Sequence, residues 1–261
     1  SIDRRQRQMC IRDSAYLGLQ QIAPDGAVTV LTDSFDGEPI AYADDVAVAR
    51  DGMIYFSDAS AKFGALKTGG SYEASLLDIM EHGGHGRVFR FDRSSGATTL
   101  VMDGLNFANG VAVSDDQSYL LVNETGTYRV LKHWLNGPDA GETEVVIDNL
   151  PGFPDNINNG RAGKFWIGLV APRNALLDNM SGMPWMRRLV QRLPAAVRPK
   201  AVPSSHVFAI NGNGEVLMNL QDTSARLPAL TGVYESRDAI WLSSLFGTNT
   251  ARLDKQDLAN P

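Results

Sequence analysis

Short apolar segments separated by glycine, aspartate and asparagine recur along most of the chain. Such runs, bounded by residues that favour turns, are typical of β-strands. The connecting sequences RDG, RSSG, SDDQS and NGNG contain residues that accept a left-handed backbone or form Asx turns. We expect strand–turn–strand units over Gly26–Asp33, Asp45–Asp58, Gly86–Asp103 and Gly110–Glu124.

A longer repeat groups these strands. A polar pair, a short apolar strand, a turn and an aromatic-rich strand follow one another four times, starting at Asp44, Asn109, Asp155 and Thr231. An outer hairpin lies between successive copies, so that each complete unit has four strands and roughly 40–50 residues. Four strands with this period are the signature of a propeller blade, and the pattern therefore predicts an all-β propeller.

Two segments interrupt the repeat with the spacing of helices. Residues Ser71–Gly83 have a Ser/Glu start and apolar positions at helical intervals, which predicts a short helix. Residues Pro184–Lys200 predict a basic amphipathic helix that is broken at Pro194. The apolar face of this second helix either packs on its own protein or contacts a membrane surface.

The first residues do not fit the strand pattern. The sequence RRQRQMCIRD, Arg4–Asp13, has no apolar periodicity and resembles a translated adapter from a sequencing library. We therefore assign residues 1–13 to a non-native or disordered tail and residues 14–261 to the propeller domain. The repeats supply too few blades to close a ring, so we expect the first blade to be missing at the N-terminus.

Charge and composition exclude several classes of function. The 261 residues carry a formal net charge of −6 without a basic stripe, which argues against a nucleic-acid partner. The apolar runs are shorter than the roughly 18 residues of a membrane-spanning helix. Cys10 is the single cysteine, so neither an internal disulfide nor a cysteine-based zinc site can form. We expect a small-molecule substrate as the partner, with contact to a membrane surface through residues 184–200 as a further possibility.

Polar residues stand at the heads of the four inner strands. Inner strands line the central channel of a propeller, so their heads should converge on one axis. These heads are Asp44-Asp45, Asn109-Gly110, Asp155-Asn156 and Thr231-Gly232. Carboxylate and amide oxygens are the ligands that Ca²⁺ prefers, and the pattern predicts a calcium site. Alternatives remain open: Asn109 could make a structural hydrogen bond, Asp155 an Asx turn, and Asp45 rather than Asp44 could face inward.

Three motifs in order resemble the strictosidine synthase-like group. They are FANGVAVS, W-x-x-G-P-x-A-G and LPGFPDNI, and the resemblance covers about Ala15 to Leu253. This group belongs to a larger set of six-bladed propellers with the gluconolactonases and paraoxonases. The resemblance therefore implies a six-bladed β-propeller that lacks its first blade here and carries two short helical insertions.

The resemblance also implies a set of metal ligands. Asp44 stands where metal-binding relatives have an asparagine at the start of the N-D-[IVL] strand, and it keeps an oxygen donor. Asn109 matches the asparagine of F-A-N-G, and Asp155 matches the aspartate of P-D-N with Asn156 beside it. A glutamate of the first blade completes the site in relatives, and that blade is expected to be absent here.

The alkaloid-forming members carry a catalytic glutamate on the last blade. Thr231 stands at that position, and Glu235 matches the glutamate that follows it. The resemblance therefore favours a calcium-dependent hydrolase of lactones or esters, of the lactonase or arylesterase type, in which Asp155 or Asp44 activates water. The alternatives are a strictosidine synthase-type enzyme that forms carbon–nitrogen and carbon–carbon bonds, and a non-catalytic propeller that binds partners through Pro184–Lys200.

Overall fold

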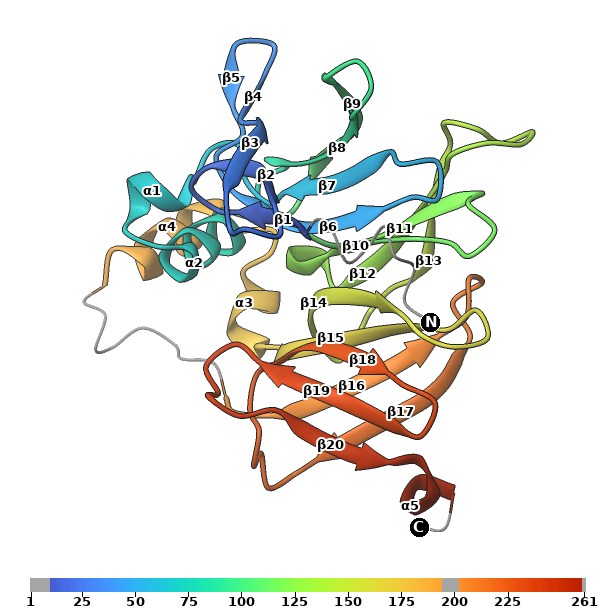
Figure 1. The fold of residues 1–261 in the computed structure, drawn as a ribbon. Helices are drawn as coiled ribbons and strands as arrows, with labels where there is room; N and C mark the ends of the chain where they lie inside the picture. Colours follow the sequence, from blue (N-terminus) through green and yellow to red (C-terminus); the bar gives the residue numbers. More distant parts are fainter. Residues whose placement is uncertain (1–9, 194–201, 260–261) are drawn as a thin grey trace. The chain divides into compact units, whose positions relative to one another are not determined.

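The computed structural model describes residues 10–193 and 202–259. The chain divides into two compact units, residues 1–109 and 110–261. Each unit is built from antiparallel sheets of consecutive strands, as the strand–turn–strand pattern predicted. In Figure 1 these sheets follow one another along the chain, and strands next to each other in sequence lie next to each other in each sheet.

The first unit contains a three-stranded sheet, a short hairpin and a four-stranded sheet. The three-stranded sheet consists of β1 (Cys10–Ser14), β2 (Gly18–Ile22) and β3 (Val28–Thr32). The hairpin pairs β4 (Ser34–Phe35) with β5 (Glu38–Pro39). The four-stranded sheet has the order β6 (Ala43–Val48), β7 (Ile54–Asp58), β8 (Gly86–Asp92) and β9 (Ala97–Leu105). Apolar side chains of both larger sheets share one core cluster that includes Leu19, Phe56 and Phe89.

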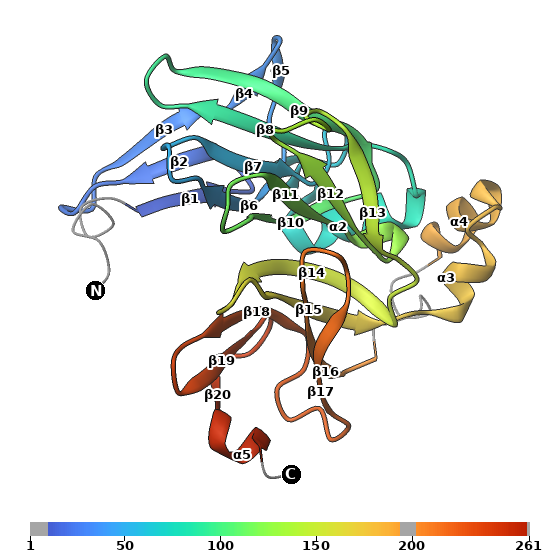
Figure 2. The same ribbon diagram turned by 90° about the vertical axis from the view of Figure 1, so that its right-hand side faces the viewer.

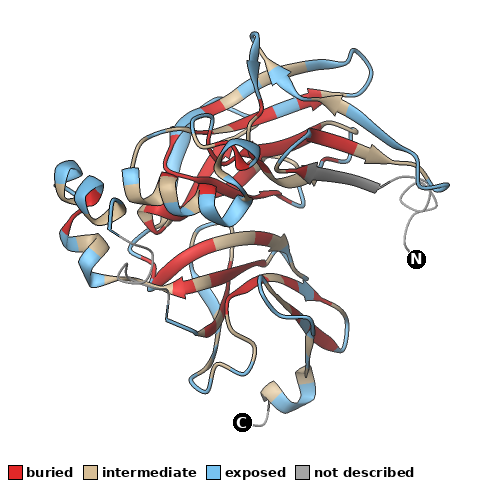
Figure 3. Ribbon diagram, turned by 90° about the vertical axis from the view of Figure 1, so that its left-hand side faces the viewer, coloured by how far each residue is buried: buried red, intermediate tan, exposed pale blue. Residues whose placement is uncertain are grey.

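The second unit contains two four-stranded sheets and one three-stranded sheet. The boundary between the units falls within β10, the first strand of the first four-stranded sheet. Their strands are β10 (Ala108–Val113), β11 (Tyr119–Glu124), β12 (Arg129–Trp134) and β13 (Thr143–Ile147); β14 (Gly152–Asn159), β15 (Phe165–Pro172), β16 (Ser205–Ile210) and β17 (Val216–Asp222); β18 (Leu230–Glu235), β19 (Ala239–Ser244) and β20 (Ala251–Asp254). Figure 2 shows the order β18, β19, β20 within the last of these sheets. Burial is greatest in β7, β10, β11 and β15. Figure 3 shows the buried residues in red.

Asparagine side chains join neighbouring sheets of the second unit. Asn123 Nδ2 on β11 donates to the carbonyl of Asp155 on β14 at 2.6 Å. Asn159 Nδ2 on β14 donates to the carbonyl of Val113 on β10 at 2.8 Å. Asn158 Oδ1 accepts from the backbone N–H of Val233 on β18 at 2.9 Å. Each bond joins a side chain of one sheet to the backbone of its neighbour, and it helps to fix the spacing between the two sheets.

The helices are few and short. They are α1 (Ala65–Thr68), α2 (Ser71–Glu81), the 3₁₀ turn η1 (Thr125–Thr127), α3 (Ala175–Asn179), α4 (Pro184–Gln191) and α5 (Lys255–Ala259). Helix α2 confirms the helix predicted over 71–83. Helix α4 confirms the first part of the second predicted helix, and residues 194–200 of that prediction lie outside the described residues. No helix in the described ranges is both long and apolar enough to cross a membrane.

The first sheet begins inside the segment assigned to a tail, and that assignment of residues 1–13 stays a prediction. Residues 1–9 lie outside the described residues, whereas the backbone of Cys10–Ser14 forms β1. Its partner is β2, in a register that sets Cys10 opposite Ile22 and Ser14 opposite Gly18. Side-chain periodicity did not indicate this strand, because the sequence up to Asp13 has no alternating apolar pattern and backbone pairing alone does not require one.

Candidate metal and substrate site

The polar pairs at three inner-strand heads sit in equivalent irregularities of the ladder. In β6, Ala43 lies opposite Asp58 and Val46 opposite Phe56, so three steps on one strand match two on the other. The same one-residue excess occurs between Pro154 and Ile157 of β14 and between Leu230 and Val233 of β18. These are β-bulges, and each contains one polar pair: Asp44-Asp45, Asp155-Asn156 or Thr231-Gly232. A bulge redirects side chains out of the normal alternation, which is how a strand head presents polar atoms at a functional site.

The bulge of β6 uses its two aspartates differently. The backbone N–H of Asp45 donates to Ser57 Oγ at 3.0 Å. The Asp45 carboxylate accepts from the backbone N–H of Val46 at 2.8 Å. Because Asp45 caps its own strand in this way, Asp44 is the residue of the pair better suited to bind a ligand.

The bulge of β14 is held in place by two hydrogen bonds to consecutive carbonyl groups. Thr125 Oγ1 donates to the carbonyl of Pro154 at 2.6 Å, and Asn123 Nδ2 donates to that of Asp155 at 2.6 Å. The donor residues are 2% and 0% exposed, respectively. The backbone that carries Asp155 and Asn156 is therefore rigidly positioned, as a binding site requires.

The close approach of two strands explains why a glycine follows Asn109 near the start of strand β10. A Cβ atom at Gly110 would lie 2.3 Å from the backbone nitrogen of Ile157 and 2.7 Å from the carbonyl oxygen of Asp155. Any side chain would therefore force β10 and β14 apart. The preceding residue, Asn109, is 3% exposed, so its amide is a buried polar group at a strand head as the sequence indicated.

Asn123 supplies a further oxygen that sequence reasoning missed. Its Oδ1 is fully buried and has no hydrogen-bond partner among the described residues. An unpaired buried amide oxygen costs about 1–3 kcal/mol, and a cation is one way to offset that cost. The donor set around the β14 bulge, made of carboxylate and amide oxygens, therefore fits Ca²⁺.

The four predicted ligands are divided between the two units. Asp44 and Asn109 belong to the first unit and head β6 and β10. Asp155 and Asn156 belong to the second and share the bulge of β14. In the described part of the chain, no three His, Cys, Asp or Glu side chains gather closely enough to hold a metal. The predicted set contains two asparagines, so it is not of that type.

The bulge of β18 contains no acid, and Glu235, which follows it, forms structural hydrogen bonds. Thr231 is buried, and its hydroxyl lies 3.5 Å from Ser243 Oγ. The Glu235 side chain is 1% exposed and accepts four hydrogen bonds. The donors are Arg161 N–H at 2.9 Å, Trp166 Nε1 at 2.8 Å, Lys164 Nζ at 2.9 Å and Lys255 Nζ at 2.6 Å.

These donors decide the charge of Glu235. Burial alone would raise the pKa of this carboxyl, but hydrogen bonds led by that of Lys255 lower it from 4.5 to about 2. Glu235 is therefore ionised and fully engaged at neutral pH. It stabilises the contact between β14–β15, β18 and the C-terminal segment, and it is not available as a base.

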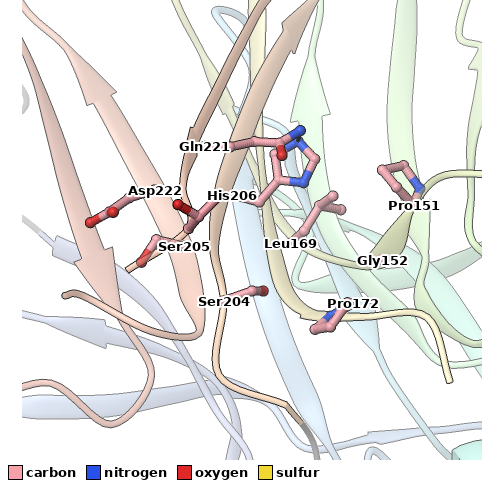
Figure 4. Close-up of a pocket in the computed structure, with 10 residues that line it drawn as sticks. Pro151, Gly152, Leu169, Pro172, Ser204, Ser205, His206, Gln221 and Asp222 are labelled. Atoms are coloured by element: carbon pink, nitrogen blue, oxygen red, sulfur yellow. Dashed lines mark hydrogen bonds between the residues drawn. The ribbon is translucent and has the colours of Figure 1, made fainter. Parts of the chain in front are cut away.

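A pocket opens at the same end of the β14–β17 sheet as the β14 bulge. Strand pairing aligns Pro154, Leu169, His206 and Gln221 in one row across the sheet. With strands about 4.8 Å apart, the backbone of His206 lies roughly 10 Å from that of Pro154. The cavity has a volume of about 250 Å³. In Figure 4 the imidazole of His206 lies beside the Gln221 amide and near Leu169, whereas the Asp222 carboxylate points away.

The polar groups that face this pocket are neutral, because its one acid, Asp222, points away and pairs with Arg226. Burial lowers the pKa of His206 below 6.5, although its hydrogen bond to Asn219 acts in the opposite direction. Nε2 of this ring lies 2.7 Å from Asn219 Oδ1 and 3.2 Å from Gln221 Nε2. Proline and leucine side chains form much of the remaining wall. The pocket therefore suits an uncharged molecule with both apolar and hydrogen-bonding parts.

One buried acid outside this region was also missed by sequence reasoning. Asp78 lies on α2 and is 0% exposed. Burial raises its pKa from 3.8 to about 7, against a hydrogen bond from Ser60 that lowers it. The repeat pattern gave no signal for this residue, because it lies in the helical insertion.

Comparison with known proteins places the chain in a family. Residues 44–138 match the family model for strictosidine synthase. Two proteins of Arabidopsis thaliana, strictosidine synthase-like 13 and strictosidine synthase-like 10, are 34% and 33% identical over 83% and 93% of this chain. The chain belongs to the strictosidine synthase-like family. It spans 53% and 65% of the length of these two members.

Solved structures confirm the fold of this strictosidine synthase-like chain. A gluconolactonase from Xanthomonas campestris has a TM-score of 0.66 at 16% identity, over 97% of this chain and 70% of that one. A calcium-binding protein, regucalcin, from Agrobacterium tumefaciens has a TM-score of 0.59 at 14% identity, over 97% and 69%. Likeness at this level of identity shows the fold alone. The strictosidine synthase-like chain is thus an all-β propeller with a few short helices, as predicted.

Proposed function

We propose that the chain is part of a calcium-dependent hydrolase that acts on lactones or esters. The observation that carries this proposal is the rigid bulge of β14, where Asp155 and Asn156 stand beside the buried, unpaired Oδ1 of Asn123. The gluconolactonase and calcium-binding relatives of the same fold support it. The count of six blades and the absence of the first blade remain predictions.

The chain's own residues would bind the ion and move the proton. Asp44, Asn109, Asp155 and Asn156 are the proposed ligands, completed by a glutamate that relatives carry on the first blade. Ca²⁺ bound there would polarise the substrate carbonyl and stabilise the oxyanion that forms on it. Asp155 or Asp44 would accept a proton from the attacking water, because both combine a carboxylate with partial solvent access.

The pocket beside His206 would hold the substrate. Its neutral polar groups and apolar walls match an uncharged lactone or ester better than an ionised molecule. His206 lies in the same row of paired residues as Pro154, at the β14 bulge. One small substrate could therefore contact both the pocket and the proposed ligands of this bulge.

The condensing reaction of the alkaloid-forming members is disfavoured. That reaction needs an acid where this chain has Thr231, and a threonine hydroxyl is not a proton acceptor near neutral pH. Glu235, the nearest acid in the sequence, is occupied by its four donors. We therefore expect no condensation of tryptamine with an aldehyde.

The test combines calcium titration with turnover. We expect calorimetry to detect one Ca²⁺ site, and turnover of phenyl acetate or of one member of a lactone panel to stop on chelation. Asp155→Ala should abolish both signals, whereas Asp148→Ala, an exposed aspartate on the same unit, should leave both unchanged. Calcium-independent turnover, or full calcium affinity in Asp155→Ala, would refute the proposal.

A further inference from the structure

Helix α4 exposes two of its large apolar residues and buries an arginine, which is unusual for a surface helix. Trp185 is 65% exposed and Leu189 is 59% exposed, whereas Arg187 is only 4% exposed. Met183, which caps the helix, and Leu176 of α3 add further exposed apolar surface at 37% and 43%. Large exposed apolar side chains grouped on one helical insertion indicate an interaction surface.

The buried arginine fixes the orientation of the helix. Arg187 Nε donates to the carbonyl of Met180 at 2.9 Å, and one of its terminal nitrogens donates to the carbonyl of Leu177 at 2.8 Å. These bonds tie α4 to the C-terminal end of α3. Arg173 holds α3 in turn, with Nε 3.0 Å from Asp178 Oδ2 and its guanidinium over the Tyr128 ring. The outward direction of Trp185 is therefore set by polar contacts on the opposite side of the helix.

The exposed face combines apolar and cationic rows. Trp185 and Leu189 are four residues apart, so they lie on one side of the helix. Arg188 and Arg192 are also four residues apart, both are exposed, and their row is adjacent to the first. The sequence of α4, PWMRRLVQ, contains no acidic residue that would neutralise them.

This arrangement matches the chemistry of a membrane interface. Tryptophan and leucine insert at the boundary between head groups and acyl chains, and arginines beside them pair with lipid phosphates. A second copy of the chain is a poorer partner, because a symmetric contact through this face would bring four arginines together without acids. We propose that the exposed face of α4 docks the protein on an anionic membrane surface, with shallow and reversible attachment.

The experiment is vesicle binding at about 0.1 M salt, near the ionic strength where the Debye length is 10 Å. We expect the chain to float with phosphatidylcholine vesicles that contain 30% phosphatidylserine and not with pure phosphatidylcholine. Trp185→Ser/Leu189→Ser should abolish flotation. Arg188→Ala/Arg192→Ala should lower the affinity for these vesicles about 30-fold, because each arginine near an anionic surface raises membrane affinity roughly fivefold.

Matched controls separate this surface from general stickiness. Tyr234→Ser removes an apolar side chain that is 66% exposed in the same unit, and Arg161→Ala/Arg237→Ala removes two exposed arginines. Both controls should bind vesicles as the parent chain does. Equal binding to both vesicle types, or unchanged binding of the α4 variants, would overturn the proposal. So would a dimer in gel filtration that Trp185→Ser/Leu189→Ser dissociates, since that result identifies a second copy as the partner.

Discussion

Replacing Glu235 by glutamine tests whether this acid is a structural anchor. The variant keeps the shape of the side chain but removes its charge. In the folded protein the pKa of Glu235 is about 2, below its ordinary value of 4.5. A depressed pKa stabilises the fold above pH 4.5, and the stabilisation is lost as pH falls through 2. At 1.36 kcal/mol for each pH unit, this contribution is about 3 kcal/mol at neutral pH.

A second estimate comes from the contacts. Removing one partner of a buried ion pair costs about 3–5 kcal/mol. Lys164 and Lys255 are 21% and 29% exposed and can turn to water, so the cost is expected near the lower limit. The indole N–H of Trp166 cannot form a hydrogen bond with water instead, because this residue is 0% exposed. Both routes therefore give about 3 kcal/mol for Glu235→Gln.

The assay is urea unfolding of the parent chain, Glu235→Gln and the control Glu142→Gln, an exposed glutamate. We expect Glu235→Gln to lose about 3 kcal/mol at pH 7 and far less near pH 2, where Glu235 of the parent is half protonated. The control should match the parent throughout. A difference that is small at pH 7, or equally large at both pH values, would refute the assignment of Glu235 as an ionised anchor.

Three further changes probe other parts of the chain. Gly110→Ala should lower the free energy of unfolding by about 3 kcal/mol, because its Cβ would meet the backbone of β14. The control Gly182→Ala should be nearly neutral, since a Cβ there meets nothing within 4 Å. Equal melting temperatures of the two variants would contradict this prediction. The carboxyl of Asp78 has a pKa raised to about 7, so its ionisation destabilises the parent fold as pH rises. The free energy of unfolding of Asp78→Asn, relative to that of the parent, should therefore increase by up to about 4 kcal/mol between pH 4 and pH 8. A difference in urea unfolding that does not change with pH would exclude a raised pKa at Asp78. Asn123→Ala should weaken calcium binding about 10- to 100-fold in calorimetry, because it removes a buried oxygen and the hydrogen bond that holds the carbonyl of Asp155. An unchanged calcium affinity would show that Asn123 has no part in the site.

The strands and the strand heads were predictable because their signals are local. Turn residues and apolar runs lie within a few positions of each other, and α2 carries its own helical spacing. The amides of Asn109 and Asn156 could be assigned to strand heads for the same reason. The placement of Asn156 relative to a ligand could not, because it depends on a bulge in β14 that adds one residue to the strand without leaving a distinct sequence signal.

Contacts between distant segments were beyond the reach of the pattern. Asn123 joins Asp155 across 32 positions, and Glu235 meets Trp166 across 69. No periodicity links such residues, and each looks like an ordinary polar residue of a strand end. Strand β1 escaped prediction for a related reason, since a strand at the edge of a sheet is held by its backbone and needs no regular apolar face.

The repeated bulge allows a blade to change its chemistry while keeping its architecture. The extra residue is already outside the regular ladder, so replacing its side chain leaves the strand register and the apolar layer beneath it intact. Thr231-Gly232 illustrates this freedom, because the same kind of bulge contains two aspartates in β6 and no acid in β18. Members of one family can therefore diverge in reaction by exchanging single residues at these detours, and a shared scaffold is a poor guide to a shared substrate.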